Sequence, residues 1–103
     1  MIAVIFEVTM KDGEAERYFE IVASLKPLLE TIDGFISVER FESTTVPGKF
    51  VSLSFWRDEA AVAAWREQAE HGLAQGLGKS EIFADFRIRV ASVLRDYSLA
   101  DRR

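Results

Sequence analysis

The sequence predicts an α+β fold of the ferredoxin-like type, a four-stranded antiparallel sheet with two helices on one of its faces. Three observations predict it. Four stretches alternate apolar and polar residues as strands do, two longer stretches repeat apolar residues at helical spacing, and the six follow one another in the order βαββαβ. With 103 residues, of which 49% are hydrophobic, the chain is expected to form one domain. Its core should span about residues 2–97, followed by a polar tail at 98–103.

The first strand is expected at residues 2–10, because this stretch is rich in Ile, Val and Phe and ends at a Lys-Asp-Gly turn. Residues 14–32 follow with apolar side chains on one helical stripe. Pro27 predicts a kink near the third turn of this helix, and Asp33-Gly34 predict its C-cap.

The second strand is expected at residues 35–43 and the third at 49–56, joined by a hairpin connection that contains Pro47-Gly48. Asp58 is a suitable N-cap for a second, Ala-rich helix that carries Trp65 and ends near His71, just before Gly72. An irregular segment should follow, from about residue 70 to 84.

The fourth strand is expected at residues 85–97, where alternation places Phe86 and Ile88 on one face and Arg87 and Arg89 on the other. Several strands are apolar on both faces, yet two helices can cover only one of them. The exposed apolar surface would exceed what soluble monomers usually tolerate. We therefore expect a homodimer in which two sheets pair face to face.

Composition excludes several classes of function. The net charge of −4 and the absence of a clustered basic surface argue against nucleic-acid binding. The chain has no cysteine and shows no basic leader and no apolar run of about 20 residues, so we expect a cytoplasmic protein without a membrane span. Clusters at metal-ligand spacing, phosphate-binding glycine loops and a Ser-His-Asp set are all missing from the sequence, and no metal site is expected.

Several groups of residues occur together in one order along nearly the whole chain: Phe55-Trp56 at a strand end, the turn 57–61, the helical segment 64–66, Glu70-His71, the strand segment 86–90, and residues 95–97. Together they resemble the antibiotic biosynthesis monooxygenase (ABM) family of dimeric α+β barrels. The resemblance implies a dimer and a monooxygenase. Members include cofactor-independent quinol oxygenases of polyketide pathways and haem-degrading oxygenases.

The family's two described sites match this chain only in part. Trp65 coincides with the helix tryptophan of the haem-degrading members. Their strand asparagine is replaced by Phe6 or Glu7, and their axial histidine lies further along the chain than His71 does. The quinol oxygenases carry an amide where this chain has Ala61. The resemblance therefore implies a small aromatic, quinol or polyketide-like substrate oxidised without a cofactor, and it favours haem less.

His71 and Trp65 are the catalytic candidates. Oxygen insertion without metal or flavin needs an electron-rich substrate, a base, a hydrogen-bond donor and a dry pocket. His71 would be the base, and Trp65 would supply a pocket wall and an indole N–H. Six residues separate the two, so they would share a pocket only if the helix bends or breaks between them. A histidine at a helix end is otherwise a cap or surface residue, and Trp65 can simply be core.

The ligand is expected to be small and hydrophobic or aromatic, bound by Phe6, Phe83 and Phe86. Arg87, with Arg89, could orient an anionic substrate, whereas the structural alternative pairs these arginines with Glu39 or Glu42 across the sheet. Three hypotheses remain open: a cofactor-free monooxygenase, a haem-binding or haem-degrading monooxygenase, and a non-catalytic dimer that binds a small ligand.

Overall fold

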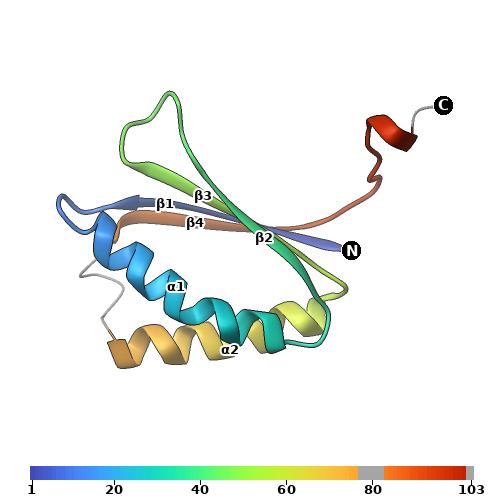
Figure 1. Ribbon diagram of the computed structural model, residues 1–103, viewed down its shortest axis with the longest axis horizontal. Helices are drawn as coiled ribbons and strands as arrows, with labels where there is room; N and C mark the ends of the chain where they lie inside the picture. The colour runs from blue at the N-terminus through green and yellow to red at the C-terminus, as the bar shows by residue number, and fades with distance from the viewer. Residues whose placement is uncertain (77–82, 102–103) are drawn as a thin grey trace.

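The structure is a computed structural model that describes the backbone of residues 1–76 and 83–101 and the side chains of residues 1–68 and 84–101. Its elements follow the predicted order (Figure 1). They are β1 (Ile2–Met10), α1 (Ala15–Thr31), β2 (Phe35–Glu42), β3 (Lys49–Trp56), α2 (Glu59–Gly76), β4 (Phe83–Ser92) and a short 3₁₀ helix, η1 (Leu99–Asp101). The bounds of β1 and β3 are those predicted from the sequence, and β2 ends one residue earlier.

The four strands form one antiparallel sheet in the order β2-β3-β1-β4, and both helices lie on one face of it (Figure 1). This is the ferredoxin-like α+β arrangement, so the predicted fold class is confirmed. β1 pairs with β3 on one side and with β4 on the other along nearly its whole length. The sheet is therefore built around β1, with β2 and β4 at its edges.

α1 ends one residue before the predicted cap. Its C-cap is Ile32, which has an extended backbone and whose N–H bonds to the carbonyl oxygen of Leu29. Gly34, two residues on, has a φ of +94°, which glycine adopts without strain. A Cβ at Gly34 would also lie 2.8 Å from the Cβ of Ala61, so glycine is required both by conformation and by the close approach of α2.

Arg57 and Asp58 fix the turn between β3 and α2. Asp58 Oδ1 accepts a hydrogen bond from the N–H of Ala61 at 2.9 Å, which confirms the predicted N-cap. Arg57 donates both to Asp58 and, at 3.1–3.2 Å, to the two carboxylate oxygens of Asp33 after α1. The Ala61 N–H and then Arg57 lower the pKa of Asp58, and Arg57 lowers that of Asp33. The start of α2 is thereby tied to the end of α1.

α2 does not end near His71. It continues as one helix past Gly72 to Gly76, so the irregular segment predicted from residue 70 is wrong over this range. A glycine in a helix interior costs only about 1 kcal/mol relative to alanine, an amount that packing of the rest of a helix readily offsets. The glycine signal therefore indicated a stop where none occurs.

β4 begins at Phe83 and ends at Ser92, not at residue 97 as the alternation predicted. Its last pair joins Ser92 to Ile2, and beyond it the N–H of Val93 bonds to the carbonyl oxygen of Met1. The strand ends where its partner β1 begins, because a strand persists only while a neighbour accepts and donates its hydrogen bonds.

Two separate clusters of buried side chains hold the helices against the sheet. The first joins the end of β1 to the start of α1, and the second joins the end of β3 to the end of α1 and the start of α2. Their members are Val8, Met10 and Tyr18 in the first, and Leu29, Trp56, Ala61 and Val62 in the second.

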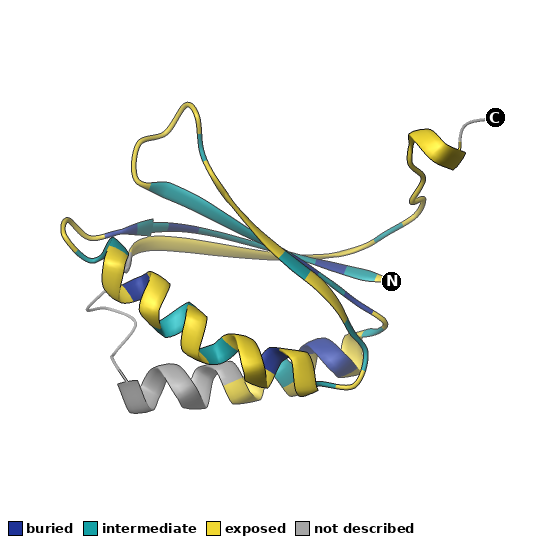
Figure 2. Ribbon diagram, viewed as in Figure 1, coloured by how far each residue is buried: buried dark blue, intermediate teal, exposed yellow. Residues whose placement is uncertain are grey.

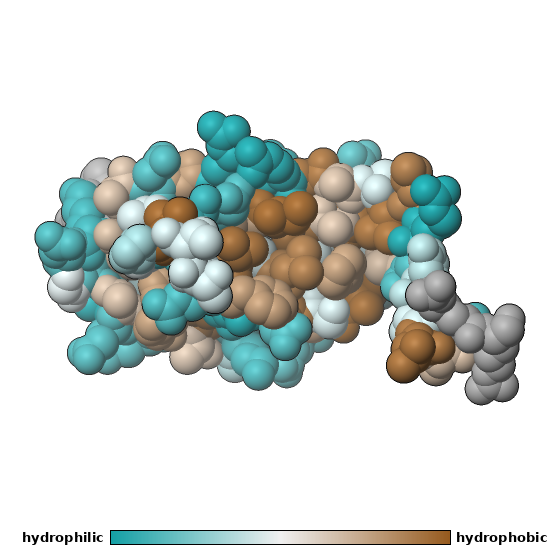
Figure 3. Space-filling model, turned by 90° about the horizontal axis from the view of Figure 1, so that it is seen from above, coloured by the Kyte–Doolittle hydropathy of each residue, from teal (hydrophilic) through white to brown (hydrophobic). Residues whose placement is uncertain are grey.

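Within residues 1–76 and 83–101 no helix covers the opposite face of the sheet, and Figure 2 shows β4 exposed along its length. Alternation turns several apolar side chains of β1, β2 and β3 toward this open face: Ile5, Phe41, Val51, Leu53 and Phe55. Figure 3 views the molecule from this side, and hydrophobic residues gather across its centre. A continuous apolar patch of this kind is typical of a protein interface. In the described part of the chain, no helix is long and apolar enough to cross a membrane.

We expect two copies of the chain to pair through this open face. Light scattering should then give about twice the 11.7 kDa of one chain at micromolar concentration. Leu53→Glu should produce a folded monomer, because it places a charge in the centre of the patch. Leu28→Glu, on an exposed position of α1, is the matched control and should remain a dimer. A stable wild-type monomer would contradict this expectation.

Candidate functional site

A cavity of about 230 Å³ lies between the helices and the sheet. Its described lining is mainly apolar and comes from β1, β2, β3, β4, α1 and α2. The lining residues are Val4, Phe6, Tyr18, Ile21, Val22, Leu25, Lys26, Leu29, Val38, Arg40, Ser52, Ser54, Val62, Trp65, Arg66, Phe86, Ile88 and Val90. Its volume is slightly below the roughly 300 Å³ at which sites for drug-sized ligands begin.

The cavity exists because β3 places small residues between two large ones. The residues of β3 on the helix side are Phe50, Ser52, Ser54 and Trp56. Phe50 packs with the first buried cluster and Trp56 belongs to the second, whereas the two serines lie between them in the cavity floor. Two short side chains in the middle of the sheet cannot reach the helices, so a space remains between the clusters.

Trp65 lines the cavity, and Trp56 packs behind it. Trp56 is fully buried, and its indole N–H donates to Ser54 Oγ at 2.9 Å. The ring of Trp65 stacks on that of Trp56, with 6.3 Å between the ring centroids and 25° between the ring planes. The buried tryptophan thus supports Trp65, which forms part of the cavity wall.

Three of the residues predicted for the site lie in the wall of this one cavity: Phe6, Trp65 and Phe86. Phe6 and Phe86 contact each other across β1 and β4, with ring centroids 6.0 Å apart. Phe86 is 44% exposed, so the wall on the β4 side is open to solvent. The spatial grouping expected for these three residues is therefore present, whereas their roles in binding are proposals taken up below.

Arg87 lies on the opposite face of the sheet. Its backbone position is opposite Glu7 in the register of β4 and β1, and with Arg89 it borders a shallow polar hollow on the open face. Arg87 is therefore not part of the cavity.

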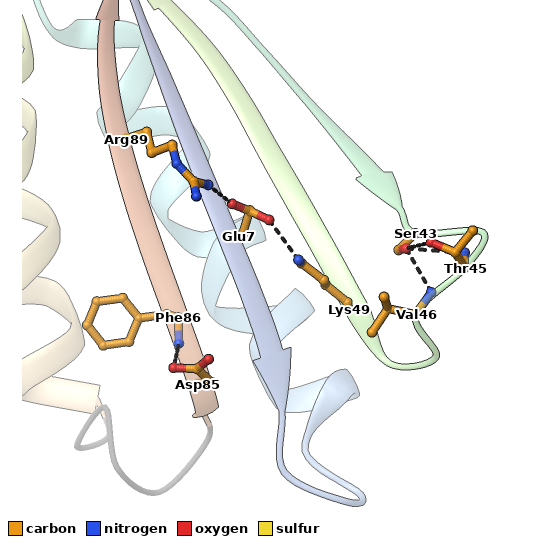
Figure 4. A network of polar contacts seen from close by, with 8 residues as sticks. All are labelled: Glu7, Ser43, Thr45, Val46, Lys49, Asp85, Phe86 and Arg89. Atoms are coloured by element: carbon orange, nitrogen blue, oxygen red, sulfur yellow. Dashed lines mark hydrogen bonds and ion pairs between the residues drawn. The ribbon is translucent and has the colours of Figure 1, made fainter.

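The predicted pairing of Arg87 and Arg89 with Glu39 or Glu42 is also wrong. Glu39 and Glu42 belong to β2, at the other edge of the sheet, with β3 and β1 between them and β4. Arg89 instead pairs with Glu7 on the adjacent strand, and Glu7 also pairs with Lys49 at 2.7 Å (Figure 4). Lys49, and to a smaller extent Arg89, lower the pKa of Glu7.

The other two predicted site residues are His71, which belongs to α2, and Phe83, the first residue of β4. The positions of their side chains are not among those that the structure describes. The break in the helix that would help Trp65 and His71 line one pocket does not occur within Glu59–Gly76.

Sequence reasoning missed the polar residues of the cavity. Tyr18 on α1 is buried, and it borders the cavity together with Arg40 on β2. Burial raises the pKa of Tyr18, and the positive charge of the nearby Arg40 offsets part of that rise. The phenol is therefore protonated at neutral pH and able to donate a hydrogen bond. The spacing Phe-x-Ser-x-Ser-x-Trp on β3 was the available signal that the helix side of the sheet has a hollow.

The described residues contain no group of three or more His, Cys, Asp or Glu side chains that could hold a metal ion. The cavity offers an apolar wall, the indole of Trp65, the phenol of Tyr18 and the guanidinium groups of Arg40 and Arg66. Such a set can exclude water, orient a ring and stabilise an anion.

A family model described as antibiotic biosynthesis monooxygenase matches residues 1–76. The jasmonate monooxygenase ABM of Pyricularia oryzae is 43% identical over 93 residues, which are 90% of this chain and 43% of that relative. The chain thus spans less than half the length of this curated relative.

Among solved structures, Rv0793 from Mycobacterium tuberculosis matches with a TM-score of 0.79 at 19% identity, over 94% of this chain and 98% of that one. A MhuD mutant with two manganese protoporphyrin IX molecules bound per active site matches with a TM-score of 0.76 at 13% identity. The match covers 95% of this chain and 99% of that one. At these identities the likeness shows the fold alone.

Ser54→Ala should lower the free energy of unfolding by about 1–3 kcal/mol, because it leaves the buried N–H of Trp56 without its acceptor. Ser24→Ala is the matched control. Its hydroxyl bonds to the carbonyl oxygen of Ile21 on an exposed part of α1, so its loss should change stability by less than about 0.5 kcal/mol. Denaturant unfolding measures both, and equal losses would show that the Trp56–Ser54 bond does not stabilise this part of the structure.

Proposed function

The chain belongs to the antibiotic biosynthesis monooxygenase family, whose model matches residues 1–76, and on this premise we propose that it is a cofactor-independent monooxygenase. Its substrate would be a small, electron-rich aromatic, quinol or polyketide-like molecule, oxidised with O2. The observation that carries the proposal is the apolar cavity between helices and sheet, with Trp65 and Tyr18 in its wall. The relative named as a jasmonate monooxygenase supports oxygenation of a small molecule by this domain type.

The chemistry requires no reductant other than the substrate. A quinol that loses a proton can pass one electron to O2, and the resulting radical and superoxide combine to form a C–O bond. The hydroperoxide then breaks its O–O bond and loses water. One oxygen atom ends in the hydroxyquinone product and the other in water, and all four electrons that O2 accepts come from the quinol. The protein needs only to orient the ring, stabilise the anion and exclude water.

We assign each part of that task to particular side chains. Phe6 and Phe86 would hold the ring of the substrate, and Trp65 would form part of the cavity wall. The protonated phenol of Tyr18 would donate a hydrogen bond to the substrate anion, because its raised pKa keeps the proton on the oxygen. His71 remains the proposed base on the grounds given by the sequence.

Haem is the alternative cofactor. A porphyrin is bound by the MhuD mutant, which shares the fold. The size of the cavity, about 230 Å³, favours a much smaller ligand than a porphyrin. We therefore propose a substrate-driven reaction in preference to a haem-dependent one.

Oxygen uptake with a panel of hydroquinones and anthrones, in the presence of a metal chelator, tests the proposal. At least one compound should be turned over by the purified protein. The free energy of unfolding of Trp65→Phe should lie within about 1.5 kcal/mol of the wild-type value, as for near-isosteric core substitutions. Its kcat/KM should nevertheless fall. His71→Ala should reduce kcat. Phe19→Leu changes an exposed aromatic residue of α1 outside the lining and should leave turnover unchanged.

Two outcomes would overturn the proposal. A sharp Soret band on titration with haem, lost in His71→Ala, would establish the haem-dependent alternative. Tight binding of an aromatic ligand without any oxygen uptake would instead identify a non-catalytic binding protein.

A further inference from the structure

The charged residues of the cavity all carry the same sign. Lys26, Arg40 and Arg66 line it, and no acidic side chain does so among residues 1–68 and 84–101. The chain as a whole has 17 acidic and 13 basic residues and a net charge of −4. Three cations from three different elements, α1, β2 and α2, therefore converge on an apolar cavity in an acidic protein. A distribution of this kind attracts an anion.

We infer that the cavity selects a substrate that carries a carboxylate, with Arg40 as its anchor and the apolar part of the substrate lying toward Phe6 and Trp65. The inference rests on the proposed function and specifies its substrate class: an aromatic or quinol-type carboxylic acid. Lys26 and Arg66 add positive charge to the same site and attract the anion toward it.

The position of Arg40 fits the role of an anchor. Arg40 lies opposite Ser52 on β3, in the row that continues through Phe6 on β1 to Ile88 on β4. This row forms the floor of the cavity from one edge of the sheet to the other. A carboxylate on Arg40 would thus leave the body of the ligand directed along an apolar floor.

Tyr18 is the neighbour of the anchor. Arg40 and Tyr18 both line the cavity, and Arg40 offsets part of the rise in the pKa of Tyr18, whose phenol is held in the first buried cluster. A guanidinium has five N–H donors, so it can face the phenol and still bind a carboxylate through two parallel hydrogen bonds. A side chain restricted by a buried neighbour loses less conformational entropy on binding than one that moves freely.

Three arginines outside the cavity, Arg17, Arg57 and Arg89, have carboxylate partners, whereas no ion pair is seen for the cavity cations or for Arg87 and Arg95 within the described residues. Arg17 pairs with Glu14 and Arg57 with Asp33 and Asp58. No ion pair joins Lys26, Arg40 or Arg66 to a carboxylate within residues 1–68 and 84–101. A simpler structural explanation is that these exposed side chains only cover the rim of the cavity with their methylene groups and bind no anion. It predicts that the protein binds an acid and its neutral ester equally well.

Binding without oxygen separates the two accounts. The para-dihydroxy isomer of dihydroxyphenylacetate is a hydroquinone-type acid, and its methyl ester keeps the same ring but replaces the charged carboxylate with a neutral group. Under nitrogen, quenching of the tryptophan fluorescence of Trp56 and Trp65 reports binding of each to the whole chain. Wild type should bind the acid at least about tenfold more tightly than the ester. Raising the ionic strength should weaken binding of the acid and not that of the ester.

Arg40→Gln should remove most of the preference for the acid, because only the weaker attraction of Lys26 and Arg66 remains, and it should leave ester binding unchanged. Arg40→Lys keeps the charge but not the planar pair of donors, so it should retain only part of the preference. Arg17→Gln removes an arginine outside the cavity and should behave as wild type. Equal affinity of wild type for acid and ester would overturn the inference even if no Arg40 variant folds, and so would an unchanged preference in Arg40→Gln.

The proposed function fails in a distinguishable way. If the acid binds through Arg40 but neither it nor any member of the panel consumes oxygen, the carboxylate site stands and the monooxygenase proposal falls. If neutral quinols are oxidised and the acid does not bind, the enzyme stands and the carboxylate anchor falls.

Discussion

The separation between the helices and the sheet is the constraint on which the rest of the structure depends. It is set at two places, by the cluster around Val8 and Tyr18 and by the cluster around Trp56 and Leu29. Between them β3 presents Ser52 and Ser54, which are too short to fill the gap. The cavity is thus a consequence of where the large residues lie, and the aromatic side chains of Phe6, Phe86 and Trp65 form part of its wall.

The sequence predicted those parts of the fold that depend on local pattern. β1 and β3 alternate clearly between turn residues, and Asp58 is a side-chain cap whose bond closes within three residues, so each was placed correctly. The predicted β4 was too long, because the end of this strand depends on its pairing with β1, which is far away in the sequence. The partner of Arg89 was wrong for the same reason: only the strand order shows that Glu7 is adjacent and that β2 is not.

The candidate site divides in a similar way. Phe6, Trp65 and Phe86 could be predicted because large apolar residues on the helix side of a strand, or on a buried helix face, must meet in the interior. Tyr18 and Arg40 could not, because α1 and β2 each present them among ordinary helix and strand residues. Their meeting depends on how α1 crosses the edge of the sheet, which no local pattern contains. Arg87 was assigned to a site on charge alone, and alternation along β4 places it on the wrong face.

The two faces of the sheet carry the same kinds of residue in different arrangements. On the open face, Glu7 lies between Lys49 and Arg89 and neutralises cations beside an apolar patch, an arrangement that suits packing against another protein surface. On the helix side, the cations stand beside apolar walls without a carboxylate among the described residues of the lining. Because Lys26, Arg40 and Arg66 are exposed, water solvates their charges and their clustering adds no large penalty to folding. Their position beside apolar walls is what the proposed ligand, an anion with an apolar body, would use.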